Sequence, residues 1–128
     1  MMLKIRNPNV GIYAVTNDYI HALEVNDMQR ILFVSGTMGL DENAVAGADL
    51  AEQLQLVWQN IRAILKNANM TTDNIVRVTS YLRQASFAEA NQNARVTALA
   101  GRTVPTTSIV VQTLETDWLV EIEIIAAA

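Results

Sequence analysis

The chain has 128 residues, of which 51% are apolar and 17% charged, so it has the size and composition of one folded domain and not of a disordered chain. Its net charge is −4, and its nine Lys and Arg form no run, which argues against nucleic acid as a partner because such binding needs a basic surface. No cysteine is present, which excludes disulfides and thiolate catalysis, and the single histidine argues against a metal site.

The amino-terminal residues 1–6 lack the long apolar core of a signal peptide. No apolar run approaches the roughly 20 residues that would span a bilayer. We therefore expect a cytoplasmic protein with no membrane partner, organised as a single domain over residues 1–128.

The chain begins with predicted strands. A weak strand pattern covers about 13–16, and stronger patterns rich in β-branched and apolar residues cover 19–25 and 30–35. Residues 26–29 are predicted to join the two stronger strands as a hairpin turn.

Two helices follow from their periodicity and end signals. In the first, about 49–68, Asp49 is a suitable N-cap, Glu52 completes a capping-box pattern, and Asn69 can take the left-handed conformation that closes a helix. The second, about 87–100, is predicted to end at Gly101. The first helix carries its apolar residues on one face at helical spacing: Leu50, Leu54, Val57, Ile61, Ile64, Leu65 and Ala68.

Further strands are predicted over 74–82, 106–112 and 119–126. The order is then β-β-β-α-β-α-β-β. This order predicts an α+β fold in which a single mixed β-sheet of five to six strands packs on two helices.

The apolar patterns also predict an oligomer. Residues 31–34 and 109–111 are apolar at successive positions, so both sides of those strands are expected to be buried. Two helices cover only one side of such a sheet. A second copy of the chain is the simplest cover for the other side.

Glu121 and Glu123 are the first candidates for chemistry. They lie two residues apart in a strand, so they point to the same side of the sheet, whereas Val120, Ile122 and Ile124 point to the other side. The pair could form a solvated strand face. Alternatively, one carboxylate could line a pocket, where it would hold a water molecule or accept a proton.

Other polar residues allow two interpretations each. Tyr19 could pack with its hydroxyl at the rim or orient a polar ligand. Ser35, at the end of a strand, suits a turn or a ligand contact. Asn91, inside the second helix, could decorate the surface or reach a neighbouring loop. His21 is interpreted as a structural histidine.

Taken in order, these segments resemble the Rid family (reactive intermediate/imine deaminases, also called the YjgF family) over about residues 10–126. Residues 19–22 look like the Tyr-Ser-His-Ala stretch of that family, and 32–36 like its Phe-Val-Ser-Gly strand end. Residues 60–65 and 87–91 are similar to its two helices. The match to the closing strand of the family, at 120–126, is almost letter for letter.

The resemblance implies a chorismate-mutase-like homotrimer with small-molecule clefts between subunits. In deaminating members, enamines or imines from amino-acid breakdown are hydrolysed to 2-keto acids and ammonia without metal or organic cofactor. By matching positions, Glu121 would act near the attacking water, Tyr19 and Ser35 would line the cleft, and Asn91 would lie nearby.

Thr107 departs from the family pattern. Residues 105–108 read Pro-Thr-Thr-Ser where deaminating members typically read Pro-Ala-Arg-Ser, and that arginine holds the substrate carboxylate. A threonine offers one neutral hydrogen bond in place of two charge-assisted ones, a loss of roughly 1.5–3 kcal/mol. Thr37 and Ala94 also replace common family residues. Arg102 could substitute for the arginine, although a cation near a helix C-terminus is the simpler interpretation.

Three functions remain open. The first is a Rid-type enzyme that acts on an imine, enamine or related nitrogenous metabolite with specificity altered by Thr107. The alternative is a non-catalytic trimer that binds a metabolite or a protein in the same cleft. A ribonuclease or translation inhibitor, a label sometimes attached to the family, is disfavoured by the acidic composition.

Overall fold

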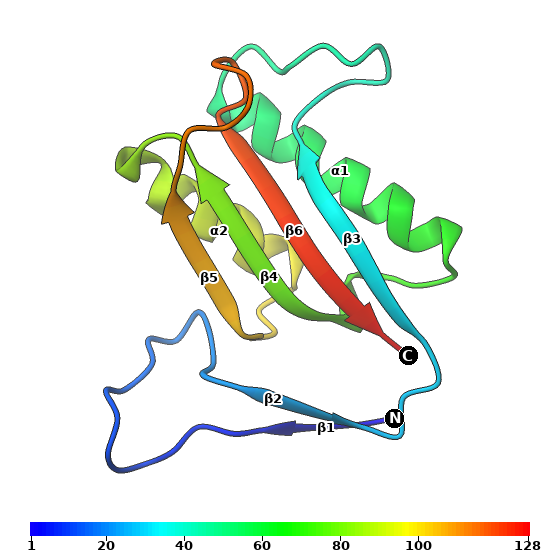
Figure 1. Cartoon of the computed structure of the whole chain (residues 1–128), viewed down its shortest axis with the longest axis vertical. Coiled ribbons are helices and arrows are strands. Elements are labelled where there is room, and N and C mark those ends of the chain that lie inside the picture. The colour runs from blue at the N-terminus through cyan, green and yellow to red at the C-terminus, as the bar shows by residue number, and fades with distance from the viewer.

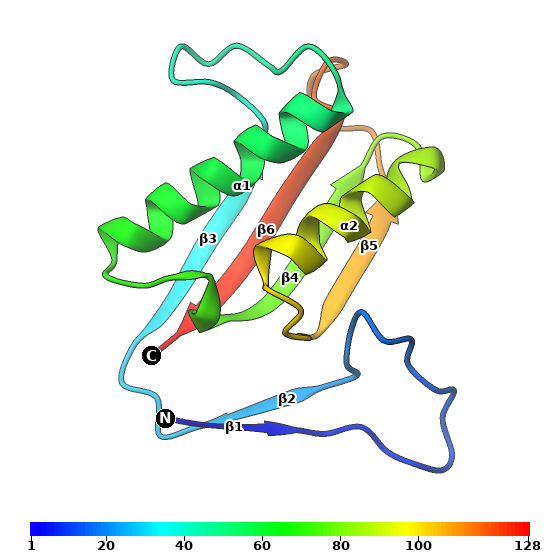
Figure 2. The ribbon, with the colours of Figure 1, turned by 180° about the vertical axis from the view of Figure 1, so that it is seen from behind.

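The computed structural model of the chain describes residues 1–128 and has the predicted order of elements. Two helices, α1 (Leu50–Asn67) and α2 (Ala88–Ala98), pack on one face of a four-stranded sheet (Figures 1 and 2). This arrangement confirms the α+β fold. Its strands are β1 (Met2–Ile5), β2 (Leu23–Asn26), β3 (Ile31–Met38), β4 (Ile75–Leu82), β5 (Thr106–Val110) and β6 (Val120–Ala127).

The main sheet has the order β3-β6-β4-β5, in which only β4 and β5 run parallel. The single sheet of five to six strands is divided, because β1 and β2 form a separate two-stranded antiparallel ribbon. One isolated bridge, between Ile20 and Pro105, is the only ladder contact between the segment before β2 and the main sheet. Figure 1 shows the ribbon lying across the lower end of the main sheet.

Three details of the amino-terminal prediction are therefore wrong. The strand predicted over 19–25 begins only at Leu23, and Ile20 before it makes just an isolated bridge. Residues 26–29 do turn the chain, and Asp27 has a φ of 55°, but they lead from one sheet into the other and do not close a hairpin between β2 and β3. The first strand is β1, and residues 13–16 form no strand. The physical reason is that a turn signal reports a change of direction and not the identity of the strand that will pair.

Helix α1 begins and ends where its sequence signals indicate. The Asp49 side chain accepts a hydrogen bond from the Glu52 backbone, and the Glu52 side chain accepts one from Ala48. At the other end, Asn69 has a φ of 55° and the Met70 amide returns to the Leu65 carbonyl. The apolar face of α1 packs on the sheet and forms most of the core with β4 and β6.

The two faces of the main sheet differ in burial. Val120, Ile122 and Ile124 of β6 are buried beneath the helices. The opposite face, called the open face below, is uncovered in the single subunit and exposes large apolar side chains, of which Phe33 is 71% exposed. Neither helix combines the length and apolarity that crossing a bilayer requires.

Candidate functional site

A track of polar side chains crosses the open face of the sheet. It follows from strand register, because Tyr81 pairs with Glu121 and Thr79 pairs with both Glu123 and Thr107. Paired residues of neighbouring strands point to the same side of a sheet. The alternation places these residues together: Arg77, Thr79 and Tyr81 of β4, Glu121 and Glu123 of β6, and Thr107 of β5.

Glu121 lies against a strand irregularity that makes room for its carboxylate. The pairing of β3 with β6 shifts register between Val34 and Thr37, so Ser35 and Gly36 form a bulge opposite β6. A Cβ atom on Gly36 would lie only 2.1 Å from Oε2 of Glu121. The carboxylate therefore fills the space that any other side chain at residue 36 would need.

A cavity of about 200 Å³ opens beside this carboxylate. The loop that follows β5 forms its other wall with Val111, Gln112, Thr113 and Leu114. Gly36, Tyr81, Glu121 and Glu123 form the sheet wall. Two carboxylates and a phenol thus line one small open cavity, which supports the interpretation of the glutamate pair as pocket residues.

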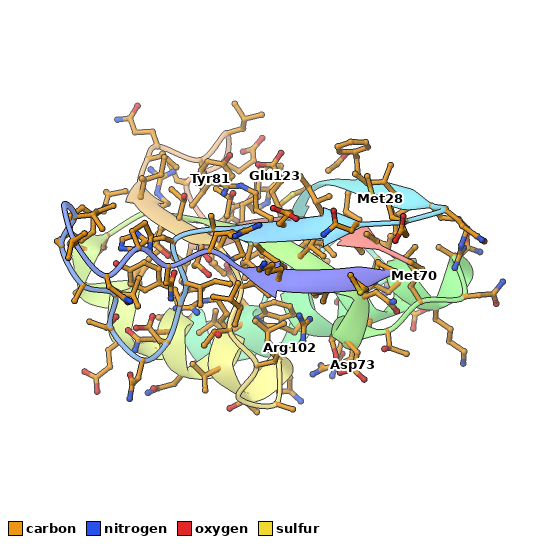
Figure 3. All side chains as sticks on the ribbon, turned by 90° about the horizontal axis from the view of Figure 1, so that it is seen from below. Met28, Met70, Asp73, Tyr81, Arg102 and Glu123 are labelled. Carbon is orange, nitrogen blue, oxygen red and sulfur yellow. The ribbon has the colours of Figure 1, made fainter.

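Tyr81 and Glu123 form the closest polar pair of the cavity. The Tyr81 hydroxyl donates a hydrogen bond of 2.8 Å to Oε1 of Glu123. This bond, together with burial and the nearby Glu121 carboxylate, raises the pKa of Tyr81 above its ordinary value. The phenol therefore stays protonated at neutral pH and acts as a hydrogen-bond donor. Figure 3 shows Tyr81 and Glu123 on the same side of the sheet.

Arg77 and Thr107 lie further along the same face. The Arg77 guanidinium donates from Nη2 to the Thr107 hydroxyl at 3.1 Å. Arg77 and Tyr81 were not among the residues selected from the sequence. The available signal is their spacing: residues 77, 79 and 81 alternate along a strand that pairs with the strand of Glu121 and Glu123.

Ser35, which the sequence predicts as a site residue, lies close to Glu121. It is exposed within the bulge, next to Gly36, and its carbonyl accepts a hydrogen bond of 3.0 Å from the Thr37 hydroxyl. Thr37 thus closes the bulge locally. Ser35, Glu121 and Thr107 share the open face, with Thr107 two strands away from Glu121.

Tyr19 lies at the other end of the sheet. Its neighbour Ile20 bridges Pro105, which lies four residues before Ile109 in the chain. Ile109 and Glu121 both pair with Tyr81, so they lie at the same level of the sheet. Four strand residues correspond to about 13 Å. One subunit therefore does not bring Tyr19 and Glu121 into one cavity.

The segment around Tyr19 is held by an ion pair between buried Arg95 and partly buried Asp18. Arg95 of α2 donates to the Asp18 carboxylate at 2.8 Å and to its carbonyl oxygen at 2.7 Å. Burial alone would raise the pKa of Asp18, but hydrogen bonds from Thr16 and Arg95 hold it below its ordinary value. His21 bonds the Tyr13 carbonyl through Nε2 at 2.9 Å, as expected of a structural histidine.

Asn91 and Arg102 lie on the helix side of the sheet. Asn91 is 1% exposed on α2, and its Oδ1 has no hydrogen-bond partner in the subunit. Arg102 donates to the carbonyl oxygens of Thr72 and Ile75 at 2.9 and 2.7 Å, and burial lowers its pKa. Figure 3 places Arg102 on the opposite side of the sheet from Tyr81, so Arg102 does not lie on the face that carries Thr107.

No group of three or more His, Asp or Glu side chains is arranged to hold a metal ion. The open face presents three groups that could take part in binding or chemistry: the Glu121 carboxylate, the neutral Tyr81 phenol and the Arg77 guanidinium.

The chain is similar to several known proteins along most of its length. A family model described as Endoribonuclease L-PSP matches residues 12–128. A RutC family protein of Pyrococcus abyssi is 31% identical over 112 residues, or 84% of each chain. Another from Aquifex aeolicus is 32% identical over 93 residues, covering 71% of this chain and 70% of its own.

The fold is also found among solved structures. That of YyfB from Yersinia pestis, a Rid family protein described as of unknown function, superposes with a TM-score of 0.85 at 27% identity and covers both chains completely. The structure of RidA from the Antarctic bacterium Psychrobacter gives a TM-score of 0.73 at 24% identity over 90% of this chain and 92% of its own, which shows the shared fold.

Proposed function

Since this chain belongs to the Rid/YjgF family, whose model carries the description Endoribonuclease L-PSP, we propose that it is a cofactor-independent hydrolase of a small imine, enamine or related nitrogenous metabolite. The observation that carries this proposal is the position of the Glu121 carboxylate. It lies against Gly36, at the wall of a cavity that Tyr81 and Glu123 also line.

The hydrolysis requires one protein group that can accept and return a proton. Water attacks the electrophilic carbon of the C=N bond, and Glu121 accepts a proton from that water as the C–O bond forms. The electron pair of the C=N π bond moves to nitrogen, which takes this proton from Glu121, and a carbinolamine results. Transfer of the carbinolamine hydroxyl proton to its nitrogen through Glu121 then lets the C–N bond break, so one imine and one water give one carbonyl compound and one ammonia. A positioned general base of this kind contributes about 10²–10⁴-fold to the rate.

The proposal includes an oligomer in which the cleft lies between subunits, as in the homotrimers of the family. Two observations support it. Phe33, Ile31 and Ile109 are exposed on the open face, which is unusual for large apolar side chains unless another chain covers them. In addition, Tyr19 and Glu121 lie too far apart in one subunit to serve one ligand, whereas neighbouring subunits could supply one each.

The direct test is ammonia release from imines generated in situ by an amino-acid oxidase, with a panel of amino acids as their source. Glu121→Gln should lower the rate of release at least about 100-fold. Glu42→Gln, which changes an exposed carboxylate outside the cavity, is the matched control and should leave the rate unchanged. If the Glu121 variant retains full activity, the carboxylate is not the base.

Thr107 supports a second candidate function, a non-catalytic trimer that binds a metabolite or a protein in the same cleft. A threonine lacks the charge with which deaminating relatives grip their substrate. Thermal stabilisation by a small ligand, with no ammonia release across the whole imine panel, would favour this candidate.

The description of the family model names ribonuclease activity, but the net charge of −4 and the nine Lys and Arg of this chain do not support it. Incubation with single-stranded RNA at low salt, where electrostatic binding is strongest, tests it directly. Cleavage that is lost in Glu121→Gln would overturn our preference for a small-molecule substrate.

A further inference from the structure

We propose that Glu123, held by Tyr81, joins Glu121 in selecting a positively charged nitrogen compound as the ligand of the cavity beside β6. The inference rests on the proposed function for the place where the ligand binds. It deepens that function by naming the class of substrate, an imine derived from an amine and bound in its protonated form. It also adds Glu123 as a residue that determines specificity.

The first argument is the hydrogen-bonding capacity of the cavity wall. The single proton of the Tyr81 hydroxyl is directed at Oε1 of Glu123, at 2.8 Å. The proton of the Thr113 hydroxyl is also engaged, since this group lies within hydrogen-bond distance of the carbonyl oxygens of Glu115 and Trp118. The wall therefore presents mainly oxygen lone pairs. A ligand that binds there has to bring N–H donors of its own.

The second argument is that the two carboxylates of the cavity have no cationic partner. The two ion pairs of the protein lie elsewhere and involve neither Glu121 nor Glu123. Both side chains are partly buried. They are two residues apart on one face of a strand, a separation of about 7 Å. A cation between them is attracted by both and displaces no existing partner.

The third argument is that no Lys or Arg lines this cavity. Arg83, just after β4, donates from Nη1 to the hydroxyl and the carbonyl oxygen of Thr113. Arg77 lies four strand residues from the level of Glu121, about 13 Å along the sheet. An organic anion in the cavity would therefore meet two carboxylates and no guanidinium, whereas a cation would meet complementary charge.

The loop wall indicates the rest of the ligand. Val111 and Leu114 line the cavity from the loop that follows β5, across from the carboxylates of the sheet wall. The Leu114 side chain is 90% exposed in the subunit, so an apolar group of a ligand can cover it. A compound that fits both walls carries an apolar group beside its charged nitrogen.

A cationic substrate also suits the proposed reaction. Two nearby carboxylates raise the pKa of an imine nitrogen and so favour its protonated form. Protonation withdraws electrons from the carbon of the C=N bond, which makes that carbon more electrophilic toward water. The charge that holds the ligand thus also prepares it for attack. Tyr81 contributes by fixing Oε1 of Glu123, while Oε2 of Glu123 keeps no partner in the subunit.

The binding test uses benzamidine, benzamide and benzoate, which share one shape and differ in charge. Calorimetry and thermal shift on the purified full chain, at pH 7 and low salt, should show that benzamidine binds most tightly and benzoate least. Glu121→Gln and Glu123→Gln should each weaken benzamidine binding about 10-fold, the lower end for a charged hydrogen bond because the cavity is open, and leave benzamide unchanged. Glu89→Gln removes the same charge from an exposed site on α2 and should behave as wild type.

Tyr81→Phe tests the positioning of Glu123. It keeps both carboxylates but releases Oε1, so it should weaken benzamidine binding by less than Glu123→Gln does. Three results would each overturn the inference: wild type that binds benzoate as tightly as benzamidine or binds neither, Glu123→Gln that keeps the full preference for benzamidine, and Glu89→Gln that loses as much of it. Circular dichroism and oligomer mass establish that each variant is folded and assembled.

A pair of substrates separates this inference from the proposed hydrolysis. The imine formed from phenethylamine by an amine oxidase lacks the carboxylate of the imine formed from phenylalanine by an amino-acid oxidase. Ammonia release should show the lower KM with the phenethylamine imine, and Glu123→Gln should raise that KM. A preference for benzamidine without ammonia release from either imine would keep the cation site and remove the hydrolase. A lower KM for the phenylalanine imine would keep the hydrolase and remove the selection of a cation.

Discussion

Replacing Gly36 by alanine tests the geometry of the Glu121 site. A Cβ atom at residue 36 would lie 2.1 Å from Oε2 and 2.8 Å from Cδ of Glu121. Since real Cβ atoms essentially never approach another heavy atom within 3.0 Å, Oε2 must move by at least 0.9 Å, the difference between 3.0 and 2.1 Å. A misplacement of about 1 Å costs on the order of 100-fold in rate when the group acts in catalysis.

The stability of the Gly36→Ala variant should nevertheless stay close to that of wild type. The atom that must give way is the far end of a flexible side chain at an open cavity, and φ at Gly36 is not positive. Alanine also reduces the conformational freedom of the unfolded chain, which contributes about 0.4–1 kcal/mol to stability. We expect the free energy of unfolding in urea to lie within about 1 kcal/mol of the wild-type value.

Gly39 provides the matched control. A Cβ atom there would lie 2.4 Å from the carbonyl oxygen and 2.6 Å from the Cα of Gln53, which are backbone atoms of α1 and cannot swing away. Gly39→Ala should therefore lower the free energy of unfolding by about 1–3 kcal/mol, the usual cost of overpacking.

The two alanine variants are compared by urea unfolding and by ammonia release from the imine panel. Equal loss of stability in both would refute the contrast between a yielding side chain and a fixed backbone. Full activity in a stable Gly36→Ala protein would refute the claim that the position of the Glu121 carboxylate against Gly36 matters for the reaction. A crystal structure of Gly36→Ala with Glu121 unmoved would refute the geometric argument itself.

Three further perturbations have defined outcomes. Asp18→Asn should lower stability by about 3–5 kcal/mol at neutral pH, because it leaves the buried Arg95 charge uncompensated. The pKa of Asp18 is lowered in the folded state, so the stability that the ion pair contributes exists above the unfolded pKa of about 3.9 and is lost as the pH falls through the folded pKa. Urea unfolding at pH 7 and at pH 3 should therefore show that the stability difference between variant and wild type is smaller in acid. The ultraviolet titration of wild type minus that of Tyr81→Phe should show one phenol whose pKa lies above 10, since the hydrogen bond to Glu123 favours the protonated form. A difference titration centred at or below pH 10 would contradict that hydrogen bond. Phe33→Glu should convert an oligomer into a folded monomer at micromolar concentration, measured by light scattering and circular dichroism, and an unchanged mass would show that the open face is not the contact surface.

The parts of the fold that the sequence predicted correctly depend on local signals. Asp49, Glu52 and Asn69 act on the backbone within a few residues, so the ends of α1 can be read from their positions. The alternation of Glu121 and Glu123 with buried neighbours likewise follows from the geometry of one strand. In each case no knowledge of a distant partner is needed.

The parts that could not be predicted depend on partners far away in the chain. The turn at Asp27 is visible in the sequence, but the pairing of β2 with β1 is not, because several strands offer similar apolar patterns. Arg77 and Tyr81 were missed for the same reason. Their importance follows from a register in which β4 lies between β6 and β5, and that register is fixed only when the sheet assembles.

Register also changes the meaning of Thr107. In the sequence it is an uncharged residue of a predicted strand, and no neighbour in the chain indicates a charged partner for it. In the sheet, β4 supplies a guanidinium to the same place, because parallel strands set residues 79 and 107 side by side and the longer side chain of residue 77 spans the remaining distance. The contact of Arg77 with Thr107 depends on the register of two parallel strands, so it could not be predicted from the residues around position 107 alone.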